Sequence, residues 1–247
     1  MVGSARAGVL DALTDLVLPA RCGGCDRQGQ RWCPSCAREV AAAPPAGRWT
    51  PTPAPGGLPD VWSVVPYEGA VRAGLANWKD NGRRDLVRVL APLLTEALLA
   101  ALLAGEDWGG PPGPDPAHGT WVVVPVPSAR PNVRRRGDRP LQDLARRSVQ
   151  AVPPAIRPPV VPALRLARTV ADQAGLHSAA RSENLRGAMV VAPTAAPSVQ
   201  GVRCVVVDDV ITTGATLAEA ARALRAAGAA VVLAATVAAT RRRPRRP

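Results

Sequence analysis

The sequence predicts an α/β fold with a largely parallel sheet flanked by helices. The first observation is an alternation late in the chain, where apolar runs at 203–207 and 231–237 flank a helix-length segment at 215–227. Strands that alternate with helices in this way are typical of parallel sheets. The second is the continuous apolar run TWVVVPVP at 120–127, which is typical of a strand buried on both faces. A chain of 247 residues is long enough for one such domain and a small module.

Four regions are expected along the chain. Residues 1–40 should hold an N-terminal helix, because apolar residues there have helical spacing, followed by a cysteine-rich module. The proline-rich connector at 41–57 is predicted to be a linker without regular structure. The main α/β domain is expected over 58–240, and a basic tail over 241–247.

Within the main domain, local composition predicts the remaining elements in order. The run VWSVVPYEG at 61–69 is expected to form a strand, and 71–104 to form one or two helices. A Gly/Pro-rich loop is expected at 109–119, and a helix around 138–150. A polar segment at 168–188 then precedes the final strand, helix and strand.

The chain is strongly basic, with a net charge of +12 and an isoelectric point of about 11.2. Such a surface attracts nucleic acid or small polyphosphates without sequence specificity. The alternative is that much of the excess belongs to a disordered cationic end, since the tail RRRPRRP holds five arginines.

No secretory leader or membrane span is expected. Asp11 and Asp15 interrupt the apolar residues at the N-terminus. The longest uncharged apolar run, at 226–240, is too short and too rich in Ala and Thr, and is better interpreted as a turn and a buried strand. We therefore expect a cytoplasmic protein that does not contact a membrane.

The cysteines form a pattern with a specific metal chemistry. Cys22, Cys25, Cys33 and Cys36 are spaced C-x2-C-x7-C-x2-C, so each pair can bind the same ion through a tight turn. Four thiolates in a tetrahedral array suit a structural Zn²⁺ and leave no open coordination position. The predicted module is a small zinc ribbon; two disulfides or redox dithiols are the alternative. Cys204 lies within an apolar run and is expected in the core.

The stretch VVVDDVITTGATL at 205–217 places two acids and a threonine-rich loop between a strand and a helix. Unpaired N–H groups at a helix N-terminus bind phosphate. Gly214 lets the backbone approach a ligand closely. Asp208 and Asp209 would repel that phosphate unless they face sugar hydroxyls or a shared Mg²⁺. The pattern thus favours a sugar phosphate, and a capped helix with two solvated acids is the alternative.

These residues closely resemble the 5-phosphoribosyl-1-pyrophosphate (PRPP) binding motif of type I phosphoribosyltransferases. The resemblance implies a phosphoribosyltransferase-type sheet, Mg²⁺ bound with PRPP, and catalytic roles for Asp208 and Asp209 at the ribose hydroxyls. It also implies that the following loop binds the 5′-phosphate through Thr212, Thr213, Gly214, Ala215 and Thr216.

The four-cysteine module, VVVPVPSARPNVRRRG and DQAGLHSAARSENLRGA together resemble the ComF family, a phosphoribosyltransferase-like group linked to natural competence and DNA uptake. This resemblance covers the chain from Cys22 to about Val237. It implies a hood segment over the site that includes Gln173, Arg181 and Asn184. His177 stands where family members carry serine, so it is interpreted as a bystander rather than a general base.

A loop after the strand at 120–127 is the candidate pyrophosphate site. Ser128, Arg130 and Arg134 are suitable donors, because guanidinium groups match phosphate oxygens; a solvated basic run is the alternative. The ComF resemblance adds Lys79, which would reach the pyrophosphate end, although a surface role for this lysine remains equally open.

Two functions follow. The first is an enzyme that binds PRPP, or a ribose 5-phosphate nucleotide, and transfers phosphoribosyl to a nitrogen acceptor. The second is a non-catalytic nucleotide-binding protein of DNA uptake, whose partners would be single-stranded DNA or a helicase. Only the resemblance to ComF proteins supports the second.

Overall fold

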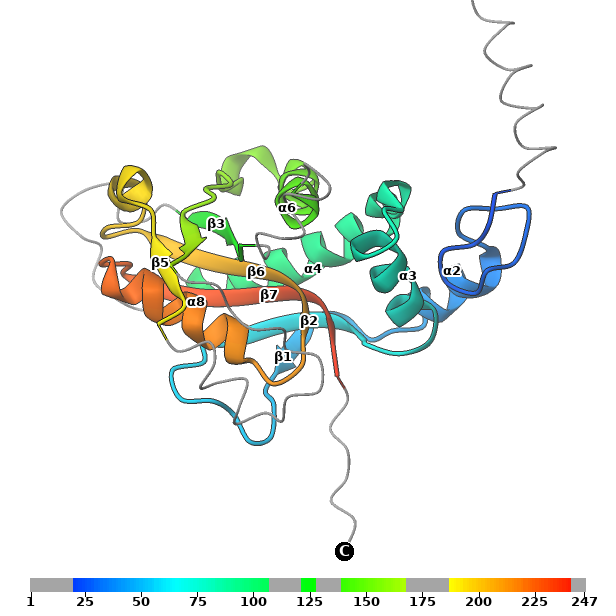
Figure 1. Cartoon of the computed structure of the whole chain (residues 1–247), viewed down its shortest axis with the longest axis horizontal. Coiled ribbons are helices and arrows are strands. Elements are labelled where there is room, and N and C mark those ends of the chain that lie inside the picture. The colour runs from blue at the N-terminus through cyan, green and yellow to red at the C-terminus, as the bar shows by residue number, and fades with distance from the viewer. Residues whose placement is uncertain (1–19, 107–120, 128–138, 168–186, 241–247) are drawn as a thin grey trace, which may run out of the picture.

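The computed structural model describes residues 20–106, 121–127, 139–167 and 187–240. Its centre is a five-stranded sheet with the order β1-β2-β7-β6-β3 (Figure 1). The strands are β1 (Gly47–Trp49), β2 (Val61–Pro66), β3 (Trp121–Pro125), β6 (Arg203–Ile211) and β7 (Val231–Ala239). Strands β2, β7, β6 and β3 run parallel, and only β1 is antiparallel to its neighbour. The predicted α/β class with a mostly parallel sheet is confirmed.

Helices α4 (Val87–Glu106), α6 (Pro140–Gln150) and α8 (Ala215–Ala226) pack on the sheet. Helix α3 (Gly69–Lys79) lies beside α2 (Pro34–Ala41), and short 3-10 turns occur at Arg84–Leu86, Pro154–Ile156 and Pro193–Ser198. The β2-α4-β3 and β6-α8-β7 connections cross the sheet in opposite directions. Because such crossovers are right-handed, α4 and α8 lie on opposite faces. Figure 1 shows α4 behind β6 and β7, and α8 in front of them.

The segment 71–104 forms two helices rather than one. The break falls at Asp80–Arg83, where Gly82 adopts a φ of 71° that an L-residue rarely takes. Helix α4 then packs beside α6: Thr95 Oγ1 donates to the Ser148 carbonyl at 2.9 Å, and Ser148 Oγ donates to the Ala91 carbonyl at 3.1 Å. Each hydroxyl also lies within hydrogen-bond distance of a carbonyl of its own helix, so these buried groups are satisfied while they join the two helices.

Helix α4, with the turn before it, is the one segment of the described residues that is long and apolar enough to cross a membrane. The sequence predicted helices over 71–104 but no membrane span there, since the longest uncharged apolar run lies at 226–240. Leu94, Ala97, Leu98 and Ala101 are fully buried, and the helix packs on β2 and β7. Its apolar character is therefore accounted for by the core.

Strand β6 extends beyond the predicted 203–207. Pairing with β7 continues through Asp208 opposite Thr236 and Val210 opposite Ala238, so the two acids lie inside the strand rather than after it. The prediction ended the strand at the first charged residue, but ladder hydrogen bonds use the backbone and do not depend on side-chain charge.

Two further regions differ from expectation. The connector at 41–57 was predicted to lack regular structure, yet its residues 47–49 form β1, which pairs with β2 as an edge strand. The polar and proline-rich residues around 160–190 contribute a second, two-stranded sheet of β4 (Leu164–Leu166) and β5 (Met189–Val191). Short strands carry too few residues for a period-two pattern to stand out, so the sequence did not show them.

Candidate functional site

The two acids at the end of β6 are both buried, with Asp208 9% and Asp209 5% exposed. Asp208 Oδ1 accepts a hydrogen bond from the Asp209 N–H at 2.8 Å, and Asp209 Oδ1 accepts from the Val210 N–H at 3.0 Å. Burial, followed by the neighbouring Asp209 carboxylate, raises the pKa of Asp208 well above its usual range. Two carboxyl groups held this closely favour a cation or hydroxyl donors as ligands.

Lys79 supplies a positive charge to this pair. Its Nζ lies 2.6 Å from Asp209 Oδ2, although the two residues are 130 positions apart in sequence. Burial alone would lower the pKa of Lys79, but the charges of Asp209 and then Asp208 outweigh it and raise that pKa. The lysine that the sequence left between a ligand role and a surface role therefore contacts the acidic pair directly.

The loop after β6 forms a helix N-terminus next to the acids. Gly214 has a φ of 79°, the left-handed conformation that favours glycine, and α8 begins at Ala215. The N-cap residue Gly214 has no side chain to cap this end of α8, and the Thr213 hydroxyl accepts from the Ala215 N–H at 3.4 Å. N–H groups at such an end attract an anion through both hydrogen bonding and the helix dipole.

Residues of the connector and Leu58, which follows it, pack against this loop. A Cβ on Gly214 would lie 3.0 Å from Leu58 Cδ1 and 3.3 Å from Pro51 Cγ, so the loop packs against the connector without spare room. Thr240 at the end of β7 also donates to the Thr212 carbonyl at 3.5 Å. No sequence pattern indicated the packing of Leu58 and Pro51 on Gly214, because these residues are more than 150 positions apart.

A charged pair on α8 holds strand β5 in place. Glu219 Oε1 accepts from the Met189 N–H at 2.9 Å, while both oxygens accept from the guanidinium of Arg222 at 2.8 Å. Arg222 Nη2 in turn donates to the Met189 carbonyl at 2.9 Å. Burial would raise the pKa of Glu219, but the bonds from Arg222 and Met189 outweigh it and lower that pKa. This pair was not predicted; the signal in the sequence was a single acid among the alanines of 218–221, and the structure buries it to 5% exposure.

The four cysteines come together as predicted. Their Sγ atoms all lie within 4.8 Å of one another, with 3.7 Å between Cys22 and Cys36 and 3.6 Å between Cys25 and Cys33. Zn–S bonds of about 2.3 Å in a tetrahedron place the sulfurs under 4 Å apart, so this cluster fits a single zinc ion. All four are free thiols, which disfavours the disulfide alternative. Cys36 lies on α2 (Pro34–Ala41), so the module is a turn and a helix rather than a ribbon alone.

Backbone N–H groups prepare one thiol for metal binding. The N–H groups of Cys33 and Gly24 lie 3.3 and 3.4 Å from Cys22 Sγ. Burial would raise the pKa of Cys22, but these bonds outweigh it and lower that pKa to about 6. Thiolates are the form that binds zinc, so this arrangement favours a bound cation. Cys204, by contrast, is fully buried on β6, where burial raises its pKa to about 12, as expected for a core cysteine.

Several predicted site residues fall outside the described parts of the chain: Ser128, Arg130, Arg134, Gln173, His177, Arg181 and Asn184. The N-terminal helix and the basic tail do so as well. The start of the proposed pyrophosphate loop is nevertheless placed. Pro125, the last residue of β3, pairs with Val207, and the Val126 N–H donates to the Val207 carbonyl at 3.0 Å. The chain therefore enters that loop directly beside Asp208.

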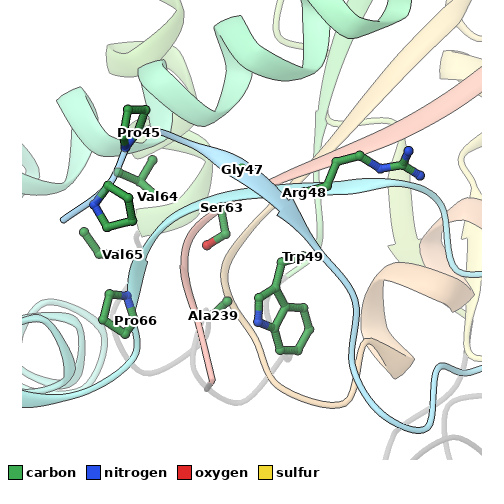
Figure 2. A pocket seen from close by; sticks show the side chains of 10 residues that line it. Pro45, Gly47, Arg48, Trp49, Ser63, Val64, Val65, Pro66 and Ala239 are labelled. Carbon is green, nitrogen blue, oxygen red and sulfur yellow. The ribbon is translucent and has the colours of Figure 1, made fainter. Parts of the chain in front are cut away.

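A shallow pocket of about 220 Å³ lies between β1 and the end of β2 (Figure 2). Trp49, Ser63 and Ala239 face it, and Ser63 Oγ is buried without a hydrogen-bond partner in the structure. The described residues that line it include none of the predicted site residues. The pocket is thus a feature separate from the acidic pair.

Comparison with known proteins agrees with the acidic pair and its loop. No curated protein matches the chain. Residues 143–247 match the model of one protein family, the phosphoribosyl transferase domain. The matched part includes β6, both acids and the loop to α8, whereas Lys79 and the four cysteines precede it. The carboxyl-terminal part of this chain is therefore similar to phosphoribosyl transferase domains.

Proposed function

We propose that the protein binds PRPP, or a ribose 5-phosphate nucleotide, at the end of β6 and transfers the phosphoribosyl group to a nitrogen acceptor. The observation that carries this proposal is the start of α8, whose N-cap Gly214 carries no capping side chain, beside two buried acids at the carboxyl end of a parallel strand. Open α/β sheets place their ligands at this edge. The family match over the same residues adds support.

The proposal assigns one set of residues to the 5′-phosphate of the ligand and another to its ribose. The 5′-phosphate is bound by the loop Thr212–Thr216, where the N-terminal N–H groups of α8 and the threonine hydroxyls are donors. Asp208 and Asp209 accept hydrogen bonds from the ribose hydroxyls and share Mg²⁺ with the ligand, because oxygen ligands suit this ion. Bound Mg²⁺ would neutralise pyrophosphate charge as it leaves.

The positive charge of Lys79 offsets part of the negative charge of the acidic pair. It neutralises one of two adjacent carboxylates, which would otherwise repel a polyphosphate. Because its side chain is 53% exposed, its ammonium group remains accessible to an incoming anion. Ser128, Arg130 and Arg134 are proposed to bind the pyrophosphate, a form of electrostatic stabilisation of the leaving group.

We further propose that the chain is ComF-like, with Zn²⁺ in the four-cysteine module as a structural ion. The clustered thiols and the resemblance quoted above support this. The non-catalytic alternative uses the same ligand site without releasing pyrophosphate, and its partners would be single-stranded DNA or a helicase.

The test is calorimetric titration of PRPP with Mg²⁺ into the wild type and into a variant carrying Asp208→Asn and Asp209→Asn. We expect binding by the wild type and a loss of at least tenfold in the variant, since charged hydrogen bonds are worth about 1.5–3 kcal/mol each. Ribose 5-phosphate and pyrophosphate, titrated separately, report on the two halves of the site. No heat with PRPP in the wild type removes the proposal.

A second measurement separates the two functions. Wild-type protein and PRPP are incubated with a panel of nitrogen bases, and released pyrophosphate is measured. Release with one base identifies the transferase, whereas binding without release across the panel favours a nucleotide-binding accessory protein.

A further inference from the structure

Lys79 holds a special position in this chain. It is the only lysine in a sequence with 31 lysines and arginines in total, and it pairs with an acid of the proposed ligand site. It is also the last residue of α3, so its place over Asp209 depends on where this helix lies. The contacts that fix α3 therefore also determine the position of Lys79.

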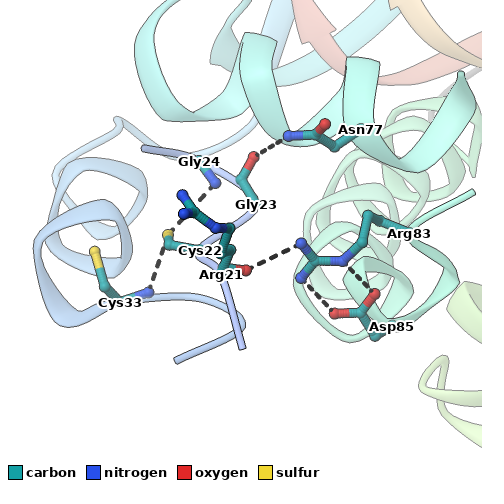
Figure 3. A network of polar contacts seen from close by, with 8 residues as sticks. All are labelled: Arg21, Cys22, Gly23, Gly24, Cys33, Asn77, Arg83 and Asp85. Atoms are coloured by element: carbon teal, nitrogen blue, oxygen red, sulfur yellow. Dashed lines mark hydrogen bonds and ion pairs between the residues drawn. The ribbon is translucent and has the colours of Figure 1, made fainter. Parts of the chain in front are cut away.

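Helix α3 is hydrogen-bonded to the cysteine module at both of its ends. Near its start, the Ala70 N–H donates to Glu39 Oε1, on α2, at 2.8 Å. Near its end, Asn77 Nδ2 donates to the Gly23 carbonyl at 2.9 Å, as Figure 3 shows. Two contacts about two turns apart fix both the height and the rotation of a helix of 11 residues.

The turn after α3 is tied to the same part of the module. Arg83 Nη1 donates to the Arg21 carbonyl at 3.0 Å, while its Nε and Nη2 donate to the two oxygens of Asp85, both at 2.9 Å (Figure 3). A bidentate pair of this kind fixes the direction of the guanidinium group. The chain is therefore held on both sides of Lys79.

Glycines allow the module and α3 to approach closely. A Cβ on Gly74 of α3 would lie 3.0 Å from the Trp32 ring. A Cβ on Gly24 would lie 2.8 Å from Cys36 Sγ and 2.9 Å from the Ala70 Cβ. Cys22, Cys33, Cys36 and Ala70 form one buried cluster with Trp32 packed against it. A shift of the cysteine residues would therefore displace α3 with them.

Two backbone carbonyl groups of the module accept the bonds from Asn77 and Arg83. They belong to Gly23 and Arg21, which flank Cys22 in the sequence. A metal bound by four thiolates fixes this segment, because such sites are rarely ordered without their ion. We propose that the metal-bound cysteine module is a positioning device for the acidic site, which acts through α3 to keep Lys79 on Asp209. The inference rests on the proposed function for its ligand, but the coupling itself rests only on contacts within the chain.

The functional consequence follows from charge. When α3 is no longer held, Lys79 leaves two buried carboxylates without its compensating charge, and they repel an incoming polyphosphate. Metal bound at the cysteines therefore strengthens PRPP binding at a site that it does not touch. Coupling between two sites in this sense is reciprocal and measurable.

The first experiment reads Lys79 without any ligand. Reductive methylation is followed by peptide mass spectrometry, which isolates Lys79 because no other lysine occurs in the chain. Wild type with zinc, wild type after chelation, and Asn77→Ala with zinc are compared. We expect faster labelling by about threefold or more in the last two, since one hydrogen bond of average strength corresponds to several-fold in population.

The matched control is Arg72→Ala. Arg72 is exposed on the same helix, and the contact between Asn77 and Gly23 does not use it. Its labelling should equal that of the wild type. Equal labelling of zinc-bound wild type and Asn77→Ala overturns the proposal, and this arm decides the matter even where chelation unfolds the protein.

The second experiment tests the coupling by a double-mutant cycle. PRPP affinity is measured for wild type and Lys79→Met, each with and without Asn77→Ala. We expect Asn77→Ala to weaken binding severalfold in the wild type and to have no effect beside Lys79→Met. An equal effect in both backgrounds overturns the proposal. An absence of PRPP binding throughout, with labelling still changed, rejects the proposed function and leaves the positioning role supported.

Discussion

Replacing Asp208 by asparagine should stabilise the folded protein while it weakens ligand binding. Asp208 is 9% exposed and lies beside a second buried carboxylate. Burial and Asp209 raise its pKa well above the usual range, so the ionised form is unfavourable in the folded state. Asparagine has the same shape, carries no charge, and keeps an oxygen that can accept the 2.8 Å bond from the Asp209 N–H.

The expected gain depends on pH in a defined direction. The pKa of Asp208 is higher in the folded than in the unfolded chain, so its stabilising contribution is complete below the unfolded value, about 3.9, and is lost as the pH rises through the folded value. Asp208→Asn therefore gains nothing near pH 4 and gains most above neutrality. Single stabilising substitutions commonly yield about 0.5–2 kcal/mol, and we expect about 1 kcal/mol at pH 8.

The assay is urea unfolding at pH 8, 6.5 and 5 without added Mg²⁺. A gain of about 1 kcal/mol raises the urea midpoint by roughly 0.3 M for a slope of about 3 kcal/mol/M. Asp209→Asn is the contrasting variant. It weakens the 2.6 Å ion pair with Lys79 and should lower stability by about 1 kcal/mol, a modest figure because that lysine is half exposed. An Asp208→Asn protein less stable than wild type at pH 8, or a difference independent of pH, would refute this reasoning.

Three further predictions concern other parts of the molecule. Glu219→Ala should lower the free energy of unfolding by about 2–3 kcal/mol, because it removes the carboxylate that accepts from the Met189 N–H and from Arg222. The control, Asp143→Ala, breaks an exposed ion pair and should change the free energy of unfolding by less than about 0.5 kcal/mol. Equal urea midpoints for the two variants would contradict this prediction. Gly214→Ala should cost about 1–2 kcal/mol, since its φ is 79° and its Cβ would press on Leu58, and calorimetry should show weaker binding of ribose 5-phosphate than in the wild type. Purified protein should contain about one zinc per chain by elemental analysis, as four thiolates per ion require; finding no metal, with all four thiols open to labelling, would contradict the zinc assignment.

Part of the fold could be predicted from the sequence, because in these elements the local residue pattern agrees with the position in the tertiary structure. The run 120–127 was predicted to be buried on both faces, and every residue of β3 is buried. The end of α8 and the start of β7 fell close to their predicted positions, since Gly228, with a φ of 87°, ends the helix and two valines begin the strand. The short strands β1, β4 and β5 were missed because three residues carry no usable periodicity.

The candidate site could be predicted in part for a different reason. Asp208, Asp209 and the loop to Gly214 are contiguous, so one stretch of sequence contains them all. The cysteines are similarly explicit, because the C-x2-C spacing prescribes a shared ion at short range. Lys79 was ambiguous because a lysine on a helix is usually solvated, and nothing local distinguishes one that reaches an acid 130 residues away.

The sequence by itself determined the chemistry that the chain carries: an acidic pair with a phosphate-type loop, and four thiols spaced for one metal ion. Only the tertiary structure decided which distant residues act on that chemistry. It placed Lys79 on Asp209, packed Leu58 under the loop, and joined the cysteine module to α3 through Asn77 and Gly23. The physical reason is that motifs are set by local backbone geometry, whereas ion pairs and close packing depend on the path of the whole chain.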